Sequence, residues 1–145
     1  MGDNENLKEY MLKEIDIIQG IINRMAHNSF MIKGWAITLV VVALLLQGTK
    51  YQILLAFIPL LVFWFLDAYF LWQERMYRKL YNWVISNRLK TDEYLFDMNA
   101  YRFKEAVQSR FRIMFSITLG WFYGSIAILI VIYAVVIFIL QKGGF

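Results

Sequence analysis

The feature that most constrains this chain is a long apolar run near its carboxyl end. Residues 113–140 include no Asp, Glu, Lys or Arg, and the flanking charges are Arg112 and Lys142. A helix of about 20 residues crosses the apolar core of a bilayer, which is roughly 30 Å thick. A soluble domain would have to bury the whole run, so this pattern predicts a membrane-spanning helix.

Two earlier runs predict a transmembrane hairpin. Residues 30–46 reach spanning length only if the Lys33 side chain extends to the membrane surface or is neutralised. Residues 51–72 form the second run, in which Asp67 is the one carboxylate. Residues 47–50 predict a short turn, so the two spans are expected to be antiparallel. A hydrophobic fraction of 60% agrees with three spans.

The distribution of basic residues predicts the orientation. Of the 15 Lys and Arg residues, Lys50 and Lys142 alone fall at the hairpin turn and the carboxyl end. Because basic residues concentrate on cytoplasmic flanks, the amino end and the central polar segment are expected in the cytoplasm, and the carboxyl end outside. The expected all-α organisation is a cytoplasmic amphipathic amino-terminal helix (1–29), the hairpin (30–72), a basic helical cytoplasmic segment (73–112), a third span (113–140) and a short external tail (141–145).

Both polar segments are expected to be helical. An apolar stripe with helical spacing and one acidic interruption includes Leu7, Met11, Glu14, Ile18, Ile21 and Met25. This stripe is too short to hold a coiled coil alone, so we expect it to pack on the central segment, on another subunit or on the lipid surface. The second span is expected to continue as a helix beyond residue 72. A further helix is expected to start near Asp97 or Asn99 and to run unbroken through Arg112 into the third span.

Asp67 is a candidate functional residue because an intramembrane charge is costly unless it faces protein or water. If the hairpin turns at residues 48 and 49, Asp67 lies within one helical turn of the level of Lys33. This register favours an ion pair between Lys33 and Asp67. An acidic ring that lines a pore and simple snorkelling are the alternatives.

Two backbone features of the spans are further candidates. Pro59 has no amide proton, so the second span is expected to kink there, either as a packing device or as a gating hinge. Small residues recur every four positions at Ser116, Gly120 and Gly124. This pattern favours close packing of helices, within the chain or between subunits of an oligomer.

The central segment combines basic and aromatic residues, which suit phosphates and bases respectively. The basic candidates for a ligand site are Arg75, Arg78, Lys79, Arg88, Lys90, Arg102 and Lys104. A nucleotide or single-stranded nucleic acid would fit this composition, which also follows from cytoplasmic topology and anionic lipid. His27 is the sole histidine and cysteine is absent, so we expect no enzyme and no cofactor or metal site.

Two short stretches carry a resemblance to known proteins. Residues 23–35 include NRMAHNSF and IKGW, and residues 66–75 include LDAYFL and ER. The stretches resemble small bacterial membrane effectors of anti-phage defence, of the Hailong type and, more loosely, of the two-span SLATT group. The resemblance implies a homo-oligomeric channel in the bacterial inner membrane that depolarises an infected cell, controlled by a nucleic-acid-derived ligand from a partner nucleotidyltransferase. The SLATT layout has no counterpart of the third run.

Two functions are compatible with the sequence. The first is an oligomeric ion-conducting effector whose basic cytoplasmic segment senses a ligand. The second is a non-conducting membrane adaptor that recruits a soluble partner through its amino-terminal helix.

Overall fold

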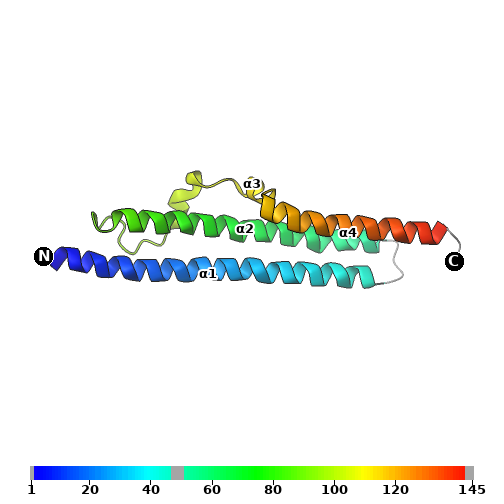
Figure 1. Cartoon of the computed structure of the whole chain (residues 1–145), viewed down its shortest axis with the longest axis horizontal. Helices are drawn as coiled ribbons and strands as arrows, with labels where there is room; N and C mark the ends of the chain where they lie inside the picture. Colours follow the sequence, from blue (N-terminus) through cyan, green and yellow to red (C-terminus); the bar gives the residue numbers. More distant parts are fainter. Residues whose placement is uncertain (1, 47–50, 143–145) are drawn as a thin grey trace. The chain divides into compact units, whose positions relative to one another are not determined.

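The computed structural model describes residues 2–46 and 51–142, which fold almost entirely into helices. In chain order the elements are α1 (Gly2–Leu45), α2 (Gln52–Asn87), a short 3-10 helix η1 (Ala100–Ala106), α3 (Arg110–Met114) and α4 (Ile117–Lys142) (Figure 1). Helices α1, α2 and α4 are each long and apolar enough to cross a membrane, as the sequence predicts. The predicted turn at residues 47–50 and residues 143–145 of the predicted tail lie outside the described residues.

Packing divides the chain into two units. The first, here called the polar unit, comprises Met1–Ser29 and Tyr69–Arg110. The second, here called the membrane unit, comprises Phe30–Ala68 and Phe111–Phe145. The divisions fall between residues 29 and 30, 68 and 69, and 110 and 111.

The polar unit has a core that α1 and α2 share. On α1, Ile18 and Ile22 are buried one turn apart, and on α2 the buried residues Met76, Leu80 and Val84 repeat every four positions. This spacing places each set on one face of its helix. Gln19 Nε2 of α1 donates to Tyr81 Oη of α2 at 3.3 Å, so the α1 stripe packs on α2 of the same chain.

The membrane unit has a narrow core and a wide apolar exterior. Its buried side chains include Ala36 on α1, Leu60 on α2 and Leu119 on α4. The outward faces carry large apolar side chains such as Ile117 and Trp121, which are 81% and 77% exposed. Exposing an apolar surface of this extent to water is unfavourable, so these faces are suited to contact with lipid or with other subunits.

The prediction of an unbroken helix from Asp97 or Asn99 into the third span is wrong at its start. Asp97 Oδ1 accepts a hydrogen bond from the Asn99 amide at 2.9 Å, and Asn99 Oδ1 accepts one from the Tyr101 amide at 3.1 Å. These local bonds stabilise turns in competition with a regular α-helix. The 3-10 helix η1 follows and ends at Ala106, and the next residue, Val107, has an extended backbone (φ −120°, ψ 145°).

The same helix is broken again between α3 and α4. The Met114 carbonyl, which in a continuous α-helix would accept from residue 118, accepts a hydrogen bond from Trp64 Nε1 of α2 at 2.8 Å. The Ser116 amide bonds to the Ile113 carbonyl three residues back, at 2.9 Å, which tightens the turn. The third span therefore starts at Ile117, as α4, with α3 as a separate short helix.

Pro59 lies inside α2. Because proline has no N–H, the Leu55 carbonyl lacks its usual intrahelical donor. The hinge role of Pro59 stays a prediction.

Candidate functional site

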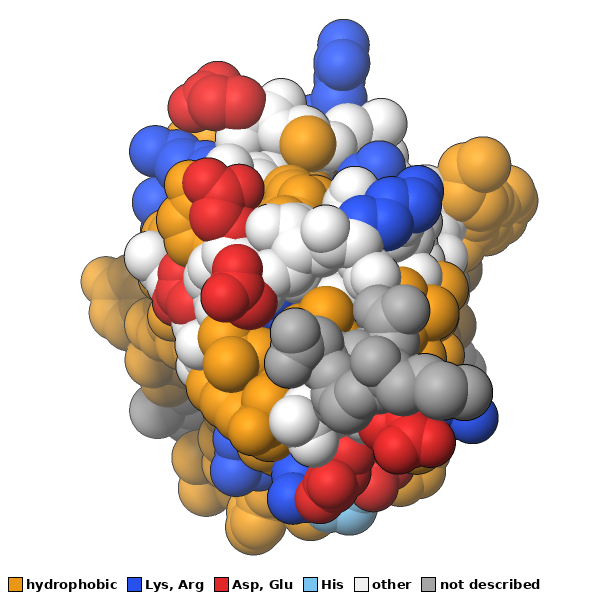
Figure 2. Space-filling model, turned by 90° about the vertical axis from the view of Figure 1, so that its left-hand side faces the viewer, with side chains coloured by type: hydrophobic (Ala, Val, Ile, Leu, Met, Phe, Trp, Pro, Cys, Tyr) orange, Lys and Arg blue, Asp and Glu red, His pale blue; other side chains and the backbone are white. Residues whose placement is uncertain are grey.

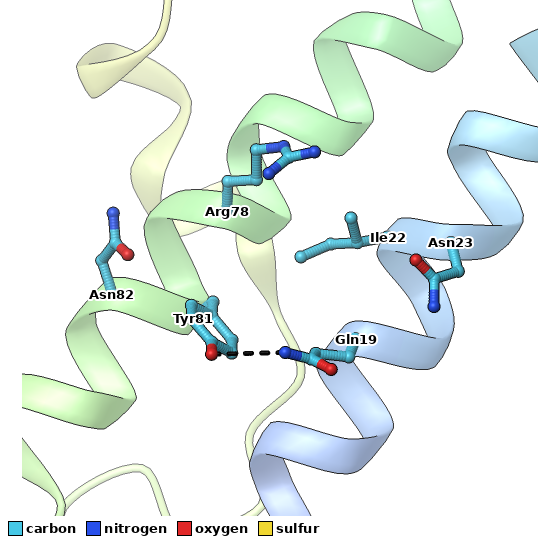
Figure 3. A pocket seen from close by; sticks show the side chains of 6 residues that line it. All are labelled: Gln19, Ile22, Asn23, Arg78, Tyr81 and Asn82. Carbon is cyan, nitrogen blue, oxygen red and sulfur yellow. Dashed lines mark hydrogen bonds between the residues drawn. The ribbon is translucent and has the colours of Figure 1, made fainter.

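The polar unit has a pocket between α1 and α2 that is lined mainly by polar side chains (Figure 3). Its volume is about 450 Å³, and its lining residues are Gln19, Ile22, Asn23, Arg78, Tyr81 and Asn82. The lining positions are three or four residues apart on each helix, so they share a face. Figure 3 shows the Gln19 amide and the Tyr81 hydroxyl pointing toward one another from the two helices. We call this hollow the amide pocket.

A second hollow, here called the basic groove, lies between α2 and the segment that follows η1. It measures about 270 Å³ and is lined by Arg75, Arg78, Lys79, Asn82, Ala106, Val107 and Gln108. Arg75 Nη1 donates to Gln108 Oε1 at 3.1 Å, and this bond positions the guanidinium at one wall. Arg78 and Asn82 line both hollows, so the amide pocket and the basic groove adjoin at these two side chains.

The seven basic ligand candidates therefore separate into three groups. Arg75, Arg78 and Lys79 come together at the basic groove. Lys90 and Lys104 are exposed and line neither hollow. The remaining two, Arg88 and Arg102, are held inside the polar unit by other side chains.

Arg88 is fully buried in an ion pair with Glu14 of α1. Its Nε and Nη2 atoms donate to the two Glu14 carboxylate oxygens at 2.6 and 2.9 Å. Nη1 donates to the carbonyls of Thr91 and Glu93 at 3.0 and 2.8 Å, and Nη2 also donates to the Tyr94 carbonyl at 3.0 Å. All five guanidinium N–H groups have acceptors. Arg88 therefore stabilises the fold, and its N–H donors are not available to a ligand.

Glu14 also fixes the loop that follows α2. Its Oε1 atom accepts a hydrogen bond from the Phe96 amide at 2.7 Å. In this loop Tyr94 and Phe96 have φ values of 56° and 57°, which are uncommon for residues other than glycine. Such conformations cost about 1–3 kcal/mol each and persist where surrounding bonds hold them, as the Glu14–Arg88 network does here. The sequence signal was the acidic interruption in an apolar stripe, because a buried carboxylate needs a partner.

Arg102 is enclosed by aromatic rings. Its guanidinium carbon lies 4.4 Å from the Trp83 ring centre, 4.6 Å from that of Tyr94 and 5.0 Å from that of Phe103. Asp97 Oδ2 is 3.9 Å from Nη1, and the guanidinium nitrogens are buried with no hydrogen-bond partner among the described residues. Ring faces attract a cation. Arg102 is therefore held among the aromatic rings by cation–π contacts, with its guanidinium nitrogens buried and its side chain 20% exposed.

The predicted pair of Lys33 and Asp67 is present in the membrane unit. Lys33 Nζ is 2.6 Å from Asp67 Oδ2, and the Asp67 side chain is completely buried. Tyr123 Oη of α4 donates to the same carboxylate oxygen at 3.1 Å. The cluster thus links α1, α2 and α4 of one chain. Asp67 faces its own helices, which is not the exposure that an acidic ring on a pore wall requires.

The small residues of α4 lie along an open groove. It measures about 330 Å³ and is lined by Phe115, Ser116, Ile117, Gly120, Trp121, Gly124, Ser125 and Ile128. A Cβ added at Gly120 would meet only the Phe115 backbone, at 3.9 Å, and one at Gly124 would meet no described atom within 4 Å. Within the described part of the chain, no other helix packs closely against these glycines.

Charges of both signs share the face of the molecule shown in Figure 2, where acidic and basic side chains alternate with apolar ones. Among residues 2–46 and 51–142, no three His, Asp or Glu side chains are grouped to hold a metal ion. Comparison of the chain with known protein families, with curated proteins and with solved structures finds no match.

Proposed function

We propose that this chain is the subunit of a homo-oligomeric membrane channel whose opening is set by a nucleotide or single-stranded oligonucleotide bound at the amide pocket. The observation that carries the proposal is the meeting of that pocket with the basic groove at Arg78 and Asn82. A ligand that carries both hydrogen-bonding edges and phosphate matches this pairing of neutral amides with cations.

The chemistry of the lining supports a nucleotide. Carboxamides such as Gln19, Asn23 and Asn82 pair with base edges because each offers a donor and an acceptor. The Arg78 guanidinium can bind a phosphate through two parallel hydrogen bonds. A volume of about 450 Å³ is within the range of small-molecule pockets. Arg75 and Lys79 add positive potential beside the pocket and favour the approach of an anion.

Conduction requires more than one copy of the chain. Ala36, Leu60 and Leu119 are buried inside the membrane unit, so the described residues of one subunit fill its interior and any pore lies between subunits. The open groove at Gly120 and Gly124 supports self-association, because small residues let the backbones of two helices approach closely. The outer faces of the spans are apolar, so a closed pore between subunits would exclude ions by dewetting.

The proposed biological setting is bacterial anti-phage defence, which rests on the resemblance of residues 23–35 and 66–75. In that setting the protein lies in the bacterial inner membrane with its amino terminus in the cytoplasm and its carboxyl terminus outside. A nucleotidyltransferase made alongside it would supply the ligand. Opening would depolarise the infected cell.

A second candidate function is a non-conducting adaptor that recruits a soluble partner through α1. The observation that favours it is the apolar outer face of α1 in the polar unit, where Leu12 is 53% and Ile17 is 45% exposed. A partner helix could bury these side chains.

Reconstitution separates the two functions. The full chain is purified in detergent, inserted into planar bilayers and tested for current with and without oligonucleotides of each base. We expect discrete current steps whose open probability changes with one oligonucleotide, and we expect Asn23→Ala with Asn82→Ala to lose this response while conductance stays. A tight bilayer together with capture of a soluble partner that requires Leu12 and Ile17 would favour the adaptor and exclude the channel.

A further inference from the structure

We propose that the basic groove binds the phosphate of an anionic phospholipid headgroup through Arg75 and Lys79. The inference does not depend on the channel or on the soluble ligand. It rests on the depth of the groove along α2, on the aromatic cluster beside it and on its size.

The position of Arg75 along α2 places one end of the groove at the level of lipid headgroups. The apolar run of α2 ends at Trp72. At about 1.5 Å per residue, Arg75 lies roughly 4–5 Å and Lys79 roughly 10 Å beyond Trp72 along the helix axis. The headgroup layer of a bilayer is about 5–8 Å thick on each side of the apolar core. Arg75 therefore lies within that layer, and Lys79 lies just beyond it, from where its flexible stem can reach back to a headgroup phosphate. Tyr81 of the amide pocket lies farther out, about 14 Å beyond Trp72.

An aromatic cluster surrounds Trp72, the buried residue from which this depth is counted. The Arg110 guanidinium lies 5.0 Å from the Trp72 ring centre, and the Tyr101 ring meets Trp72 edge-on at 5.8 Å. Gln73 Nε2 donates to the hydroxyls of Tyr69 and Tyr101 at 2.8 and 3.3 Å. Tyr and Trp with apolar bodies and polar tips are enriched where membrane meets water.

The size and charge of the groove fit a phosphate group better than a whole nucleotide. Its volume of about 270 Å³ is just below the roughly 300–1,000 Å³ of drug-sized ligand pockets. Arg75 is held at the wall by Gln108, and Lys79 is exposed. The nearby carboxylate of Glu74 accepts a hydrogen bond from Arg78 Nε at 2.7 Å, which offsets its repulsion of an anion. Lysine and arginine at this depth attract anionic lipid.

The test measures lipid selectivity with the full chain in nanodiscs that contain phosphatidylcholine and a minor fraction of phosphatidylglycerol. Lipids that remain bound after extraction are counted by native mass spectrometry. We expect the preference for phosphatidylglycerol to fall about tenfold in Arg75→Gln with Lys79→Gln. The matched control, Lys90→Gln with Lys104→Gln, removes the same charge from the same unit and should keep the preference.

Further arms decide between sources of phosphate. Lys79→Gln alone, at an exposed residue, should lose part of the preference even if the double variant misfolds. Equal loss in the control pair would show a general charge effect and would overturn the proposal. If the wild type shows no preference for phosphatidylglycerol, and inorganic phosphate or an oligonucleotide displaces the bound lipid, the groove binds a soluble anion. That outcome would overturn the proposal. A variant of Asn23, which lines the amide pocket and not the basic groove, tests the amide pocket separately.

Discussion

The polar unit and the membrane unit each contain one buried ion pair between α1 and α2, and the two pairs have opposite polarity. In the polar unit α1 supplies the acid, Glu14, and α2 the base, Arg88. In the membrane unit α1 supplies the base, Lys33, and α2 the acid, Asp67. Sliding α1 along α2 by one turn would separate both pairs and leave the buried charges of Glu14, Arg88 and Asp67 without these partners. We infer that the two pairs specify the register of the antiparallel helices, a role that is better attested for buried charges than a gain in stability.

The pairs differ in how completely they are satisfied. Arg88 is fully buried and uses its donors on Glu14 and on three carbonyls, so it fixes a loop as well as a helix. The Lys33 side chain is 22% exposed and shares Asp67 with Tyr123. A lysine with a flexible stem can extend toward water if its partner is lost, whereas Arg88 cannot. The polar pair should therefore be the more costly one to break.

The largest expected effect is that of Glu14→Leu. This change leaves the Arg88 guanidinium buried without its carboxylate and removes the acceptor of the Phe96 amide. We expect a loss of about 3–5 kcal/mol of stability and earlier proteolysis between residues 88 and 97. Thermal unfolding in detergent and limited proteolysis measure the two effects.

The double variant Glu14→Leu with Arg88→Met sharpens this prediction. Replacing both charges by apolar residues often restores the stability that one deletion removes. Here recovery should be incomplete, because the carbonyls of Thr91, Glu93 and Tyr94 lose their common donor. Full recovery would mean that Arg88 contributes nothing to the loop.

Asp67→Asn should have a smaller effect of the same kind. It removes the negative partner of Lys33 and weakens the bond from Tyr123, so oligomers in detergent should melt at a lower temperature. We expect a loss of about 1–3 kcal/mol of stability, less than for Glu14→Leu, because the Lys33 side chain can extend toward water. The charge-reversed pair Lys33→Asp with Asp67→Lys should restore part of the loss. Unchanged melting of Asp67→Asn would contradict a structural role.

Gly120→Leu tests the outer surface of the membrane unit, not its core. The nearest atoms to an added Cβ are 3.9 Å away, so the fold of one subunit should tolerate the change. The groove on α4 would be filled, and we expect the oligomer distribution to shift toward smaller species in native mass spectrometry. Gly34→Leu is the matched control, because Gly34 has no described atom within 4 Å of an added Cβ and lies outside the groove.

The sequence predicted the spans well because long apolar runs have few alternatives. It placed Lys33 and Asp67 within one helical turn of each other. The assumed turn at residues 48 and 49 gives equal depth to residues of the two spans whose numbers sum to 97 or 98. The observed pair sums to 100, so the two side chains meet two or three residues away from that register. Periodicity could not reveal the breaks before η1 and between α3 and α4, since they depend on side-chain bonds such as those of Asp97 and Asn99 and that of Trp64 to the Met114 carbonyl. Net basic charge could not separate Arg75 and Lys79, which line a groove, from Arg88 and Arg102, which are enclosed.

The smallest expected effect concerns an exposed pair on α1, Glu9 and Lys13, which serves as the reference for the two buried pairs. Lys13 Nζ is 2.7 Å from Glu9 Oε1, and this hydrogen bond and the attraction between the charges hold the pKa of Glu9 below its usual value and that of Lys13 above it. Because the pKa of Glu9 is lower in the folded protein than in the unfolded chain, its contribution to stability is complete above the unfolded pKa and is lost as pH falls through the folded pKa.

NMR titration of Glu9 in Lys13→Gln should show its pKa return toward the usual value, with little change in melting temperature. High salt should reproduce that return in the wild type, since exposed charges are screened. Melting that falls as steeply in Lys13→Gln as in Glu14→Leu would contradict the distinction between exposed and buried pairs.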